Sequence, residues 1–368
     1  MHIWHVVPHH LTFVHRGAAA LAAQGHTITL ATRSRSYPHT PDMRVVHLPP
    51  YAGLRDPKRM ARTLRHTPPA GFLRAPGPLR DRIRYAPFYA HPPPDVMHVH
   101  FPMTADLYPT LDRAPGVVSC WGSDLNLLPE QPPAEQARRL EVLRRADAIT
   151  CVSTALAAEV KRLAGREAHV VHSAAPYLPD APPRPPNDPP VIVTVARLHP
   201  VKGIDLLLAA LARLLRRGVD FRAWLIGDGP LWKEVRYSIT DLGLGAHVEL
   251  IGRLPFAQVV ERLYAADLFV LSSHAEGIAT AALEAMAAGL PVVSTDVGGM
   301  REALRHGVLV PPRDPDALAD AVGDLLAAPD RRAQLGRDAR AHMRAAFTAG
   351  QQAAGWHAVY TDVLGADW

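Results

Sequence analysis

Short apolar runs alternate with helical patterns along the first half of the chain. The runs are rich in β-branched residues, and amphipathic stretches near 15–24, near 134–145 and from 154 onward separate several of them. The runs read HIWHVV, HTITLAT, DVMHVHF, GVVSC, ADAITCV and AHVVH. Strands that alternate with helices predict βαβ units and a parallel sheet. We therefore expect residues 1–173 to form one Rossmann-like α/β domain.

A proline-rich segment then interrupts this alternation. Eight of the seventeen residues in 174–190 are proline. Such a composition cannot continue a helix or an inner strand, and it favours an extended polyproline conformation. The segment is predicted to be a linker between two domains.

A second alternating series follows the linker. Its apolar runs read VIVTVA, FRAWLIG, HVELIG, DLFVLSS, LPVVST and GVLVP, with helical patterns such as IDLLLAALARLLRR between them. Residues 191–349 are therefore expected to form a second doubly wound domain, and 350–368 a helix that packs back on the first domain. Open α/β sheets bind ligands beyond the carboxyl ends of their strands. We expect the two domains to face a cleft in which the chemistry takes place.

The composition agrees with a folded globular protein. Of 368 residues, 48% are apolar and 20% are charged, close to the values of ordinary soluble domains. The apolar runs are shorter than the roughly 18 residues that a membrane span needs, and the first strand begins without a charged leader. These features predict a cytoplasmic protein. Cys120 and Cys151 end two β-like runs and are expected to be reduced core thiols.

Positive charge is concentrated in one segment of the first half. Residues 51–90 contain nine cations and two anions. A cationic helix there could attract an acidic acceptor or an anionic lipid surface at the inner membrane face, which is the less favoured interpretation. The alternative is a solvated face whose arginines pair with local carboxylates. Nucleic acid is not expected as a partner, because aromatic residues make up only 6% of the chain and are too sparse for base stacking.

The turn after the first strand of the second half carries the clearest candidate site. It reads RLHPVKGID, so Arg197 and Lys202 flank the start of a helix. Two cations beside free helix N–H groups suit a phosphate or a diphosphate. The alternative is an ordinary solvated loop. The motif G-x-G-x-x-G, which marks dinucleotide-binding domains, follows the first strand of neither half. The sequence therefore does not favour a dinucleotide-dependent oxidoreductase.

Two glutamates form a second candidate site. Glu276 lies just after a strand with Gly277 beside it, and Glu284 lies in the helix that follows. Carboxylates at this edge of a sheet could orient a polar substrate and accept hydrogen bonds from vicinal hydroxyls. The alternatives are that Glu276 caps the helix N-terminus and that Glu284 is a surface charge.

These elements, in their order and spacing, resemble the retaining glycosyltransferases of family four, which have the GT-B fold. The resemblance is carried by ARLHPVKGIDLLLAAL, WLIGDGP, VELIGRL, EGIATAALEAMAAGLPVVSTDVGG and VLVPPRDPDALADAV, and more weakly by segments of the first half. It implies that a nucleotide diphosphate sugar donates its sugar to an acceptor with retention at the anomeric carbon. Arg197 and Lys202 would then bind the diphosphate, Glu276 the donor sugar and Glu284 the ribose. The remaining residues that the resemblance assigns to the donor are Gly277, Ile278, Ala279, Thr280, Arg253 and Leu254.

The first half departs from the family pattern where the acceptor is expected. Pro8 to Leu11 replace a Gly-Gly loop, and Trp121 replaces a histidine. The acceptor, whether a small molecule, a glycan or a lipid, is therefore left open. The acceptor-side candidates are His9, His10, His100, Trp121 and Asp124. His98 and His100 alternate on one strand and are interpreted as polar lining of the cleft, with a metal site as the less favoured alternative.

The resemblance predicts an enzyme that needs neither a cofactor nor a metal ion. Cations and helix N–H groups can neutralise the departing diphosphate without a divalent ion, and the leaving phosphate would accept the acceptor's proton on the same face of the sugar. A sugar-nucleotide epimerase or hydrolase of the same fold is an alternative. So is a noncatalytic binding protein that retains the fold.

Overall fold

The computed structural model describes residues 1–7, 11–34, 41–48, 63–64, 67–75, 79–102, 113–181 and 184–365, and at three positions in 79–84 it describes the backbone alone. Contacts between residues divide the chain into two compact units. The first unit contains residues 1–174 and 349–368, and the second contains residues 175–348. The chain therefore leaves the first unit once and returns to it for its last helix.

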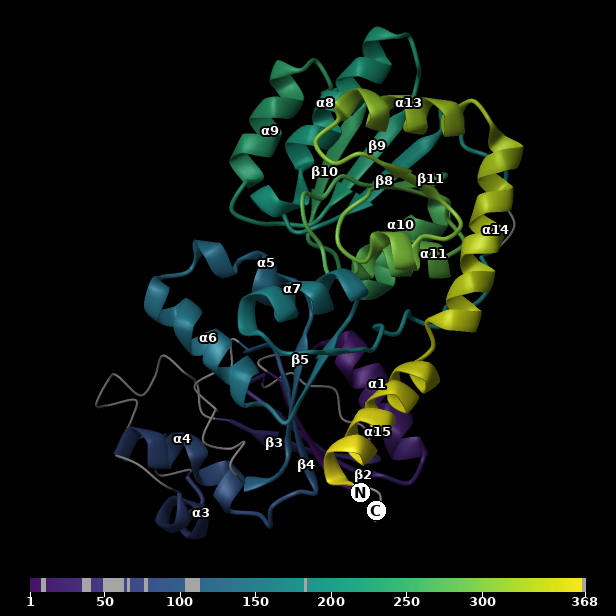
Figure 1. The fold of residues 1–368 in the computed structure, drawn as a ribbon. Helices are drawn as coiled ribbons and strands as arrows, with labels where there is room; N and C mark the ends of the chain where they lie inside the picture. Colours follow the sequence, from purple (N-terminus) through teal and green to yellow (C-terminus); the bar gives the residue numbers. More distant parts are fainter. Residues whose placement is uncertain are drawn as a thin grey trace. The chain divides into compact units, whose positions relative to one another are not determined.

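A seven-stranded parallel sheet forms the centre of the first unit (Figure 1). Its strand order is β3-β2-β1-β4-β5-β6-β7. Strands β2 and β3 therefore lie on one side of β1 and β4 to β7 on the other, and the strand order reverses between β1 and β4. The strands are β1 (His2–Val7), β2 (Thr27–Thr32), β3 (Met43–His47), β4 (Val96–His100), β5 (Gly116–Cys120), β6 (Ala148–Cys151) and β7 (His169–Val170).

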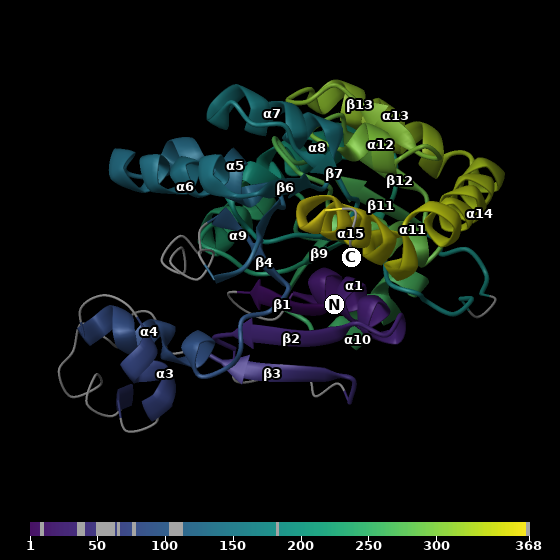
Figure 2. The same ribbon diagram turned by 60° about the horizontal axis from the view of Figure 1, so that its bottom comes forward.

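The last helix of the chain completes the core of the first unit. α15 (Ala349–Leu364) packs against α1 (Thr12–Ala23), and the two lie side by side in Figures 1 and 2. Gly17 of α1 leaves no room for a side chain, because Trp356 of α15 fills that space. Trp356 and Tyr360 are buried together with Ile3 and Val96 of the sheet. The other helices of the unit are α3 (Pro69–Arg74), α4 (Leu79–Tyr89), α5 (Ser123–Asn126), α6 (Pro133–Arg145) and α7 (Thr154–Ala164).

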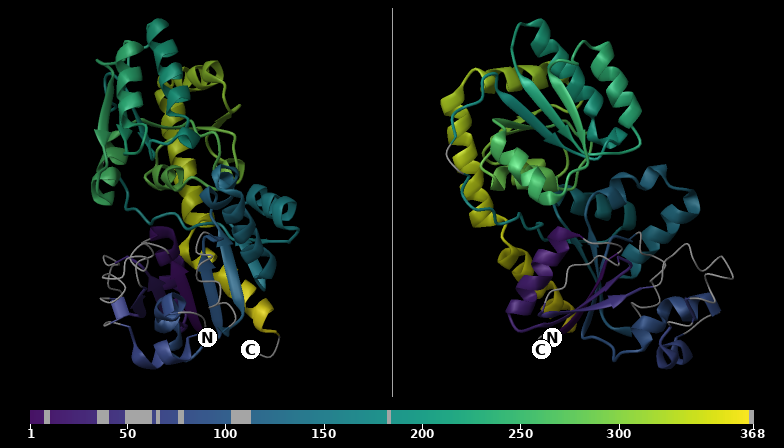
Figure 3. Two further views of the ribbon diagram at one scale, coloured as in Figure 1. Left: turned by 90° about the vertical axis from the view of Figure 1, so that its left-hand side faces the viewer. Right: turned by 180° about the vertical axis from the view of Figure 1, so that it is seen from behind.

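The second unit has a six-stranded parallel sheet in the order β10-β9-β8-β11-β12-β13, which the rear view in Figure 3 shows with its covering helices. The order reverses between β8 and β11. The strands are β8 (Val191–Val195), β9 (Arg222–Ile226), β10 (Val248–Gly252), β11 (Leu268–Leu271), β12 (Val292–Thr295) and β13 (Val308–Val310). The helices are α8 (Ile204–Arg216), α9 (Trp232–Asp241), α10 (Phe256–Ala265), α11 (Thr280–Ala287), α12 (Met300–Ala303), α13 (Pro315–Leu326) and α14 (Pro329–Ala346).

The predicted fold class is confirmed: the chain contains two Rossmann-like units with parallel sheets. All six apolar runs of the second half are strands. Both cysteines are free and buried, and Ser153 caps α7 by accepting a hydrogen bond from the Leu156 amide. Among the described residues, no helix is both long and apolar enough to cross a membrane.

Two details differ from the sequence predictions. Strand β3 was not predicted, because its run MRVVH is short and contains two basic residues, although its apolar and polar positions alternate in part. The run AHVVH forms a strand of only two exposed residues.

Candidate functional site

The residues of the predicted donor site meet where the strand order of the second unit reverses. Lys202 follows β8, and Glu276 follows β11, the neighbour of β8 in the sheet. Between β8 and α8 the chain makes a short 3-10 turn over Pro200–Lys202 and then a left-handed residue, Gly203, with φ of 57°. A side chain at Gly203 would collide with the carbonyl of Ser272 after β11. The two loops can therefore approach closely only because residue 203 is glycine.

An ion pair joins the two loops. Lys202 Nζ lies 2.6 Å from Glu276 Oε1, with 24% of the lysine side chain and 8% of the glutamate side chain exposed. Ser273 Oγ donates a second hydrogen bond to the same carboxylate oxygen, also at 2.6 Å. Removing a carboxylate from water is costly unless it is paired and hydrogen-bonded. Lys202 and Ser273 together fix the Glu276 carboxylate in one position.

The backbone around Glu276 is held from the neighbouring strand. Thr295 Oγ1, at the end of β12, donates to the Ser273 carbonyl at 2.6 Å. The Gly299 amide donates to the Gly277 carbonyl, also at 2.6 Å. A side chain at Gly298 would collide with the Glu276 carbonyl. These contacts fix the loop that carries the glutamate.

Two helix N-termini lie next to this ion pair in sequence. α8 starts after Gly203 and α11 starts after Ala279, and neither N-cap makes a side-chain hydrogen bond. The expectation that Glu276 caps α11 is therefore wrong. Free N–H groups at helix N-termini attract anions, and Lys202 adds a positive charge. The arrangement suits a phosphate or diphosphate group.

The GDGP segment after β9 supports the same loop. The Leu198 amide donates to the Asp228 carbonyl at 3.0 Å, and the Leu231 amide donates to the Leu198 carbonyl at 3.1 Å. Gly227 and Gly229 both lie against this backbone, where a Cβ atom would collide with the carbonyls of residues 196 and 198. The segment thus shapes the turn that carries Arg197.

The other predicted donor residues lie at the carboxyl-end side of the same sheet. Arg197 is exposed in the loop after β8, and Arg253 is exposed after β10 beside the half-buried Leu254. Glu284 lies in the second turn of α11 and is half-buried, so it is not simply a surface charge. Gly277, Ile278 and Ala279 are buried and Thr280 is half-buried. Ser273 was not among the predicted residues, and its only sequence signal is its place directly after a buried strand.

The acceptor-side candidates that the structure describes lie in the first unit, and His100 and Asp124 are fully buried. His98 and His100 have no exposed surface, so their interpretation as polar lining of a cleft is wrong. They face the interior beside His5 of β1, a residue that sequence reasoning missed. His5 Nδ1 and His100 Nε2 are 2.9 Å apart. His98 Nδ1 lies 2.6 Å from the Tyr360 hydroxyl, and His98 Nε2 lies 2.7 Å from Ser119 Oγ.

These three histidines are the group in the described part of the chain whose nitrogen atoms are close enough to hold a metal ion. Imidazole is a common zinc ligand. All three side chains are neutral when they bind a metal, however, so a divalent ion would keep most of its charge in a fully buried place, and such burial is costly. Both nitrogens of His98 already have partners. We interpret the cluster as a hydrogen-bonded network within the core.

Asp124 holds the loop that follows β5. Its carboxylate is fully buried and accepts hydrogen bonds from the amides of Trp121, Gly122 and Leu125 at 2.9, 2.7 and 3.1 Å. Burial raises its pKa to about 6, although these amides act in the opposite direction. Trp121 is half-buried and its ring packs against Phe13 and Trp356. His9 and His10 lie outside the described residues, as does most of the first part of the basic segment 51–90.

Each half of the chain is similar to a family of glycosyltransferase domains. Residues 180–342 match the model described as glycosyl transferases group 1, and residues 11–174 match the glycosyl transferase 4-like domain. Together the two matches cover most of the chain and support a glycosyltransferase.

Curated relatives carry related names. A GDP-mannose-dependent phosphatidylinositol monomannoside mannosyltransferase from Mycolicibacterium smegmatis is 36% identical over 41% of this chain and 42% of its own length. A D-inositol 3-phosphate glycosyltransferase from Segniliparus rotundus is 35% identical over 41% of this chain and 35% of its own length. A teichuronic acid biosynthesis glycosyltransferase from Bacillus subtilis, named as putative, is 29% identical over 73% of this chain and 71% of its own length. The chain thus spans less than half of the first two relatives.

Solved structures show the same fold over nearly the whole chain. Sucrose-phosphate synthase from Thermosynechococcus elongatus has a TM-score of 0.76 at 22% identity and covers 99% of both chains. HepE from Anabaena, in complex with UDP and glucose, has a TM-score of 0.70 at 18% identity and covers 98% of this chain and 99% of its own. At this identity the likeness establishes the GT-B fold.

Proposed function

We propose that the chain is a retaining glycosyltransferase that moves a sugar from a nucleotide diphosphate sugar to an acceptor without a metal ion. The observation that carries the proposal is the Lys202–Glu276 ion pair at the reversal point of the second sheet. It places a cation and a carboxylate beside two helix N-termini that lack side-chain caps. The cation and the helix N-termini can bind a diphosphate, and the carboxylate beside them can accept hydrogen bonds from the sugar attached to it.

Lys202 and the helix N-termini would act on the leaving group. Departure of a nucleoside diphosphate develops negative charge on the phosphate oxygens. Preorganised donors stabilise such charge most where water is excluded, and the Lys202 side chain is only 24% exposed. Arg197, exposed in the same loop, supplies the second cation. The family resemblance assigns both residues to the diphosphate.

Glu276 would act on the sugar. In the structure its carboxylate accepts hydrogen bonds from Lys202 and Ser273. When the donor binds, Lys202 would turn toward the diphosphate, and the Glu276 carboxylate would then accept hydrogen bonds from the sugar hydroxyls. Glu276 orients the sugar in this scheme and is not a nucleophile. The leaving phosphate oxygen takes the proton of the acceptor hydroxyl as the new glycosidic bond forms on the same face, which retains the configuration.

The comparisons support the class of donor. The mannosyltransferase relative is named for GDP-mannose, and the HepE structures contain UDP or UDP-glucose. Those donors belong to those proteins. For this chain we propose a nucleotide diphosphate sugar, and for its acceptor a small molecule, a glycan or a lipid. We also keep the sequence prediction that basic residues in 51–90 contact an anionic acceptor or an anionic membrane face.

A donor screen tests the proposal. The purified chain is incubated with UDP-, GDP-, ADP- and dTDP-sugars, and release of the nucleoside diphosphate is measured with and without candidate acceptors. We expect one donor to be consumed, with the sugar transferred and its anomeric configuration kept, as read by proton NMR of the product. Release without transfer to any acceptor would favour a hydrolase. Conversion of the sugar within the intact donor would favour an epimerase, and binding without turnover would favour a noncatalytic protein.

A further inference from the structure

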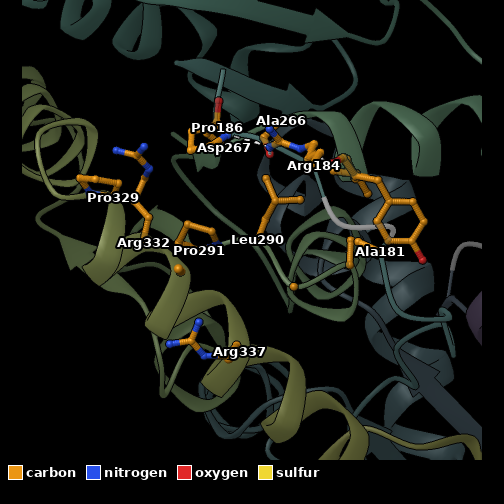
Figure 4. A pocket seen from close by; sticks show the side chains of 15 residues that line it. Ala181, Arg184, Pro186, Ala266, Asp267, Leu290, Pro291, Pro329, Arg332 and Arg337 are labelled. Atoms are coloured by element: carbon orange, nitrogen blue, oxygen red, sulfur yellow. Dashed lines mark hydrogen bonds and ion pairs between the residues drawn. The ribbon is translucent and has the colours of Figure 1, made fainter. Parts of the chain in front are cut away.

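The second unit contains another pocket, at the edge of the sheet opposite to the Lys202–Glu276 site. Asp267 directly precedes β11 and Pro291 directly precedes β12, so the pocket lies at the amino ends of these strands. Its volume is about 470 Å³, within the roughly 300–1,000 Å³ typical of ligand sites. Figure 4 shows Arg332 and Arg337 on α14 at one side, Arg184 on the other, and Leu290 with Pro291 between Arg332 and Arg184.

The pocket has two positive charges that its own lining does not neutralise. Asp267 is the acidic residue among the lining residues, and its carboxylate is already satisfied. Arg184 Nη2 donates to it at 2.9 Å, and Asn187 Nδ2 and the Val191 amide donate at 2.7 and 2.8 Å. Arg184 and Asp267 therefore cancel one another, and the charges of Arg332 and Arg337 remain.

Arg332 is fixed in place by the fold. It is 7% exposed, and its Nη1 donates to the carbonyl of Leu325, at 2.6 Å, and to that of Leu326, at the end of α13. These contacts use one of the three guanidinium nitrogens and leave the other two for a ligand. Burial lowers the pKa of this guanidinium, which shows that its charge is poorly solvated. An anion in the pocket would compensate that charge.

The start of α14 favours an anion as well. Pro329, the first residue of this 18-residue helix, lines the pocket, and the N-cap residue Ala328 makes no side-chain hydrogen bond. The N-terminus of a helix carries partial positive charge within its first turn. Arg332 lies in this turn, so the fixed side chain and the helix dipole act at the same place.

Apolar side chains complete the walls. Leu263, Leu290 and Pro291 line the pocket together with Tyr264, whose hydroxyl donates to the Pro179 carbonyl at 2.8 Å. A ligand would thus meet Arg332 and Arg337 at one side, the paired Arg184 at the other, and carbon surface between them. Arginine pairs with phosphate through two parallel hydrogen bonds, and a phosphomonoester carries nearly two negative charges at neutral pH.

We propose that this pocket binds the phosphomonoester group of a small molecule or of a lipid headgroup, with Arg332 and Arg337 as its cationic ligands. The site is separate from the donor site, since the two share no residue, and the proposal does not depend on the proposed function.

The test measures phosphate binding with the donor site disabled. Arg197→Ala/Lys202→Ala serves as the background, so that phosphate does not bind to the cations predicted for the diphosphate. Glycerol 3-phosphate is titrated by calorimetry at constant ionic strength, with chloride as the reference anion. Binding to phosphatidic acid vesicles and to phosphatidylcholine vesicles is measured by sedimentation.

Two variants remove the site in different ways. Arg337→Gln removes an exposed cation, and Ala333→Leu adds bulk at an exposed position of the lining. Each is expected to weaken phosphate binding at least tenfold. Arg332→Gln should do the same, but it also removes the contacts to α13, so its folding is checked by circular dichroism. The matched control is Arg331→Gln, an exposed arginine on the same helix that does not line the pocket.

The outcomes distinguish a free phosphate compound from a lipid headgroup as the ligand. Saturable binding of glycerol 3-phosphate that the lining variants reduce and Arg331→Gln does not would identify a free phosphate compound. Binding only to phosphatidic acid vesicles, with the same dependence on Arg337, would identify a lipid headgroup. Absence of both, or equal effects of Arg337→Gln and Arg331→Gln, would overturn the proposal.

Discussion

Lys202 shows how one residue can serve both the fold and the chemistry. The sequence left open that Lys202 belongs to an ordinary solvated loop. The structure instead pairs it with a carboxylate that is 8% exposed. Removing one partner of a buried pair leaves the other uncompensated. Lys202 therefore stabilises the protein in addition to its proposed action on the diphosphate.

Lys202→Ala is expected to lower kcat by roughly 100- to 1,000-fold, as loss of one preorganised donor to developing charge typically does. It should also lower the free energy of unfolding by about 1–3 kcal/mol, because a buried acceptor loses its partner. Kinetics and urea denaturation measure the two effects. In Lys202→Ala/Glu276→Gln we expect stability to recover without activity, and Lys233→Ala, an exposed lysine of α9, should change neither. An unchanged kcat in Lys202→Ala would remove the diphosphate assignment.

Ser273 is the residue through which the fold positions Glu276. Ser273→Ala removes its hydrogen bond to the carboxylate, and hydrogen bonds to charged groups contribute about 1.5–3 kcal/mol. We expect kcat/KM for the donor to fall at least tenfold, while the fold is kept. Ser294→Ala is the matched control, since Ser294 is a buried serine of the adjacent strand β12 whose hydroxyl donates to the Thr295 carbonyl. Equal kinetics for the two variants would assign Ser273 a purely structural role.

Among the elements, α15 depends most on distant sequence. Its Tyr360 hydroxyl lies 2.6 Å from His98 Nδ1 of β4, and both groups are buried. Tyr360→Phe leaves this nitrogen without its partner, so we expect the free energy of unfolding to fall by about 1–3 kcal/mol. Trp356→Ala should cost more, about 3–5 kcal/mol, because it opens a cavity in the core. Thermal and urea denaturation of the full chain provide the test, and a smaller effect for Trp356→Ala than for Tyr360→Phe would contradict this packing.

The elements also show which parts of the structure the sequence could predict. The six strands of the second half were predictable because each is a short, mostly apolar run followed by turn residues, as expected for a parallel sheet with helices on its faces. The turn with Arg197 and Lys202 and the loop with Glu276 were predictable because chemistry-bearing residues follow such runs directly. Lys202 and Glu276 pair because β8 and β11 are neighbours in the sheet. This strand order is a long-range feature that the local sequence pattern does not predict.

The same limit explains the errors in the first half. His98 and His100 were expected to be accessible because they stand near the end of a strand. Their burial depends on α15, about 260 residues later in the chain, which packs over this face of the sheet with Trp356 and Tyr360. Local pattern contains no information about this packing. Ser273 was overlooked because serine after a strand is common and its partner is known only from the fold.

For the whole molecule, the buried histidines predict a pH dependence. Burial lowers the pKa of His5 to about 3 and that of His98 and of His100 well below the usual value. The unfolded chain binds protons at these residues below about pH 6.5, whereas the folded chain does not. Stability is therefore complete above about pH 6.5 and decreases as the pH falls, by about 1.4 kcal/mol per pH unit for each histidine.

Asp124 acts in the opposite direction. Its pKa is raised to about 6 in the folded protein, so between about pH 6 and 4 the folded state takes up this proton more readily and gains stability as the pH falls. One carboxyl group opposes three histidines, so the net stability should still fall. Urea denaturation at pH 7.5, 6.5, 5.5 and 4.5 measures this change. A free energy of unfolding that stays constant or rises toward pH 4.5 would contradict the burial of the cluster.

Metal dependence is also a property of the whole molecule. Because Lys202, Arg197 and the helix N-termini supply the positive charge of the proposed mechanism, we expect full transferase activity in excess EDTA. The assay compares EDTA-treated protein with protein supplied with Mn²⁺ or Mg²⁺. Strict dependence on either ion would contradict the proposed mechanism and would make His5, His98 and His100 the first residues to replace.

The return of the chain to its first unit has a consequence for biosynthesis. The ribosome completes strands β1 to β7 before it begins the second unit, yet Trp356 and Tyr360, which cover the apolar face around Ile3 and Val96, belong to the last twenty residues. During synthesis of residues 175–348 this face is covered by α1 but lacks α15, so it offers a surface to chaperones or to aggregation. The unit that emerges first is thus the one that finishes folding last.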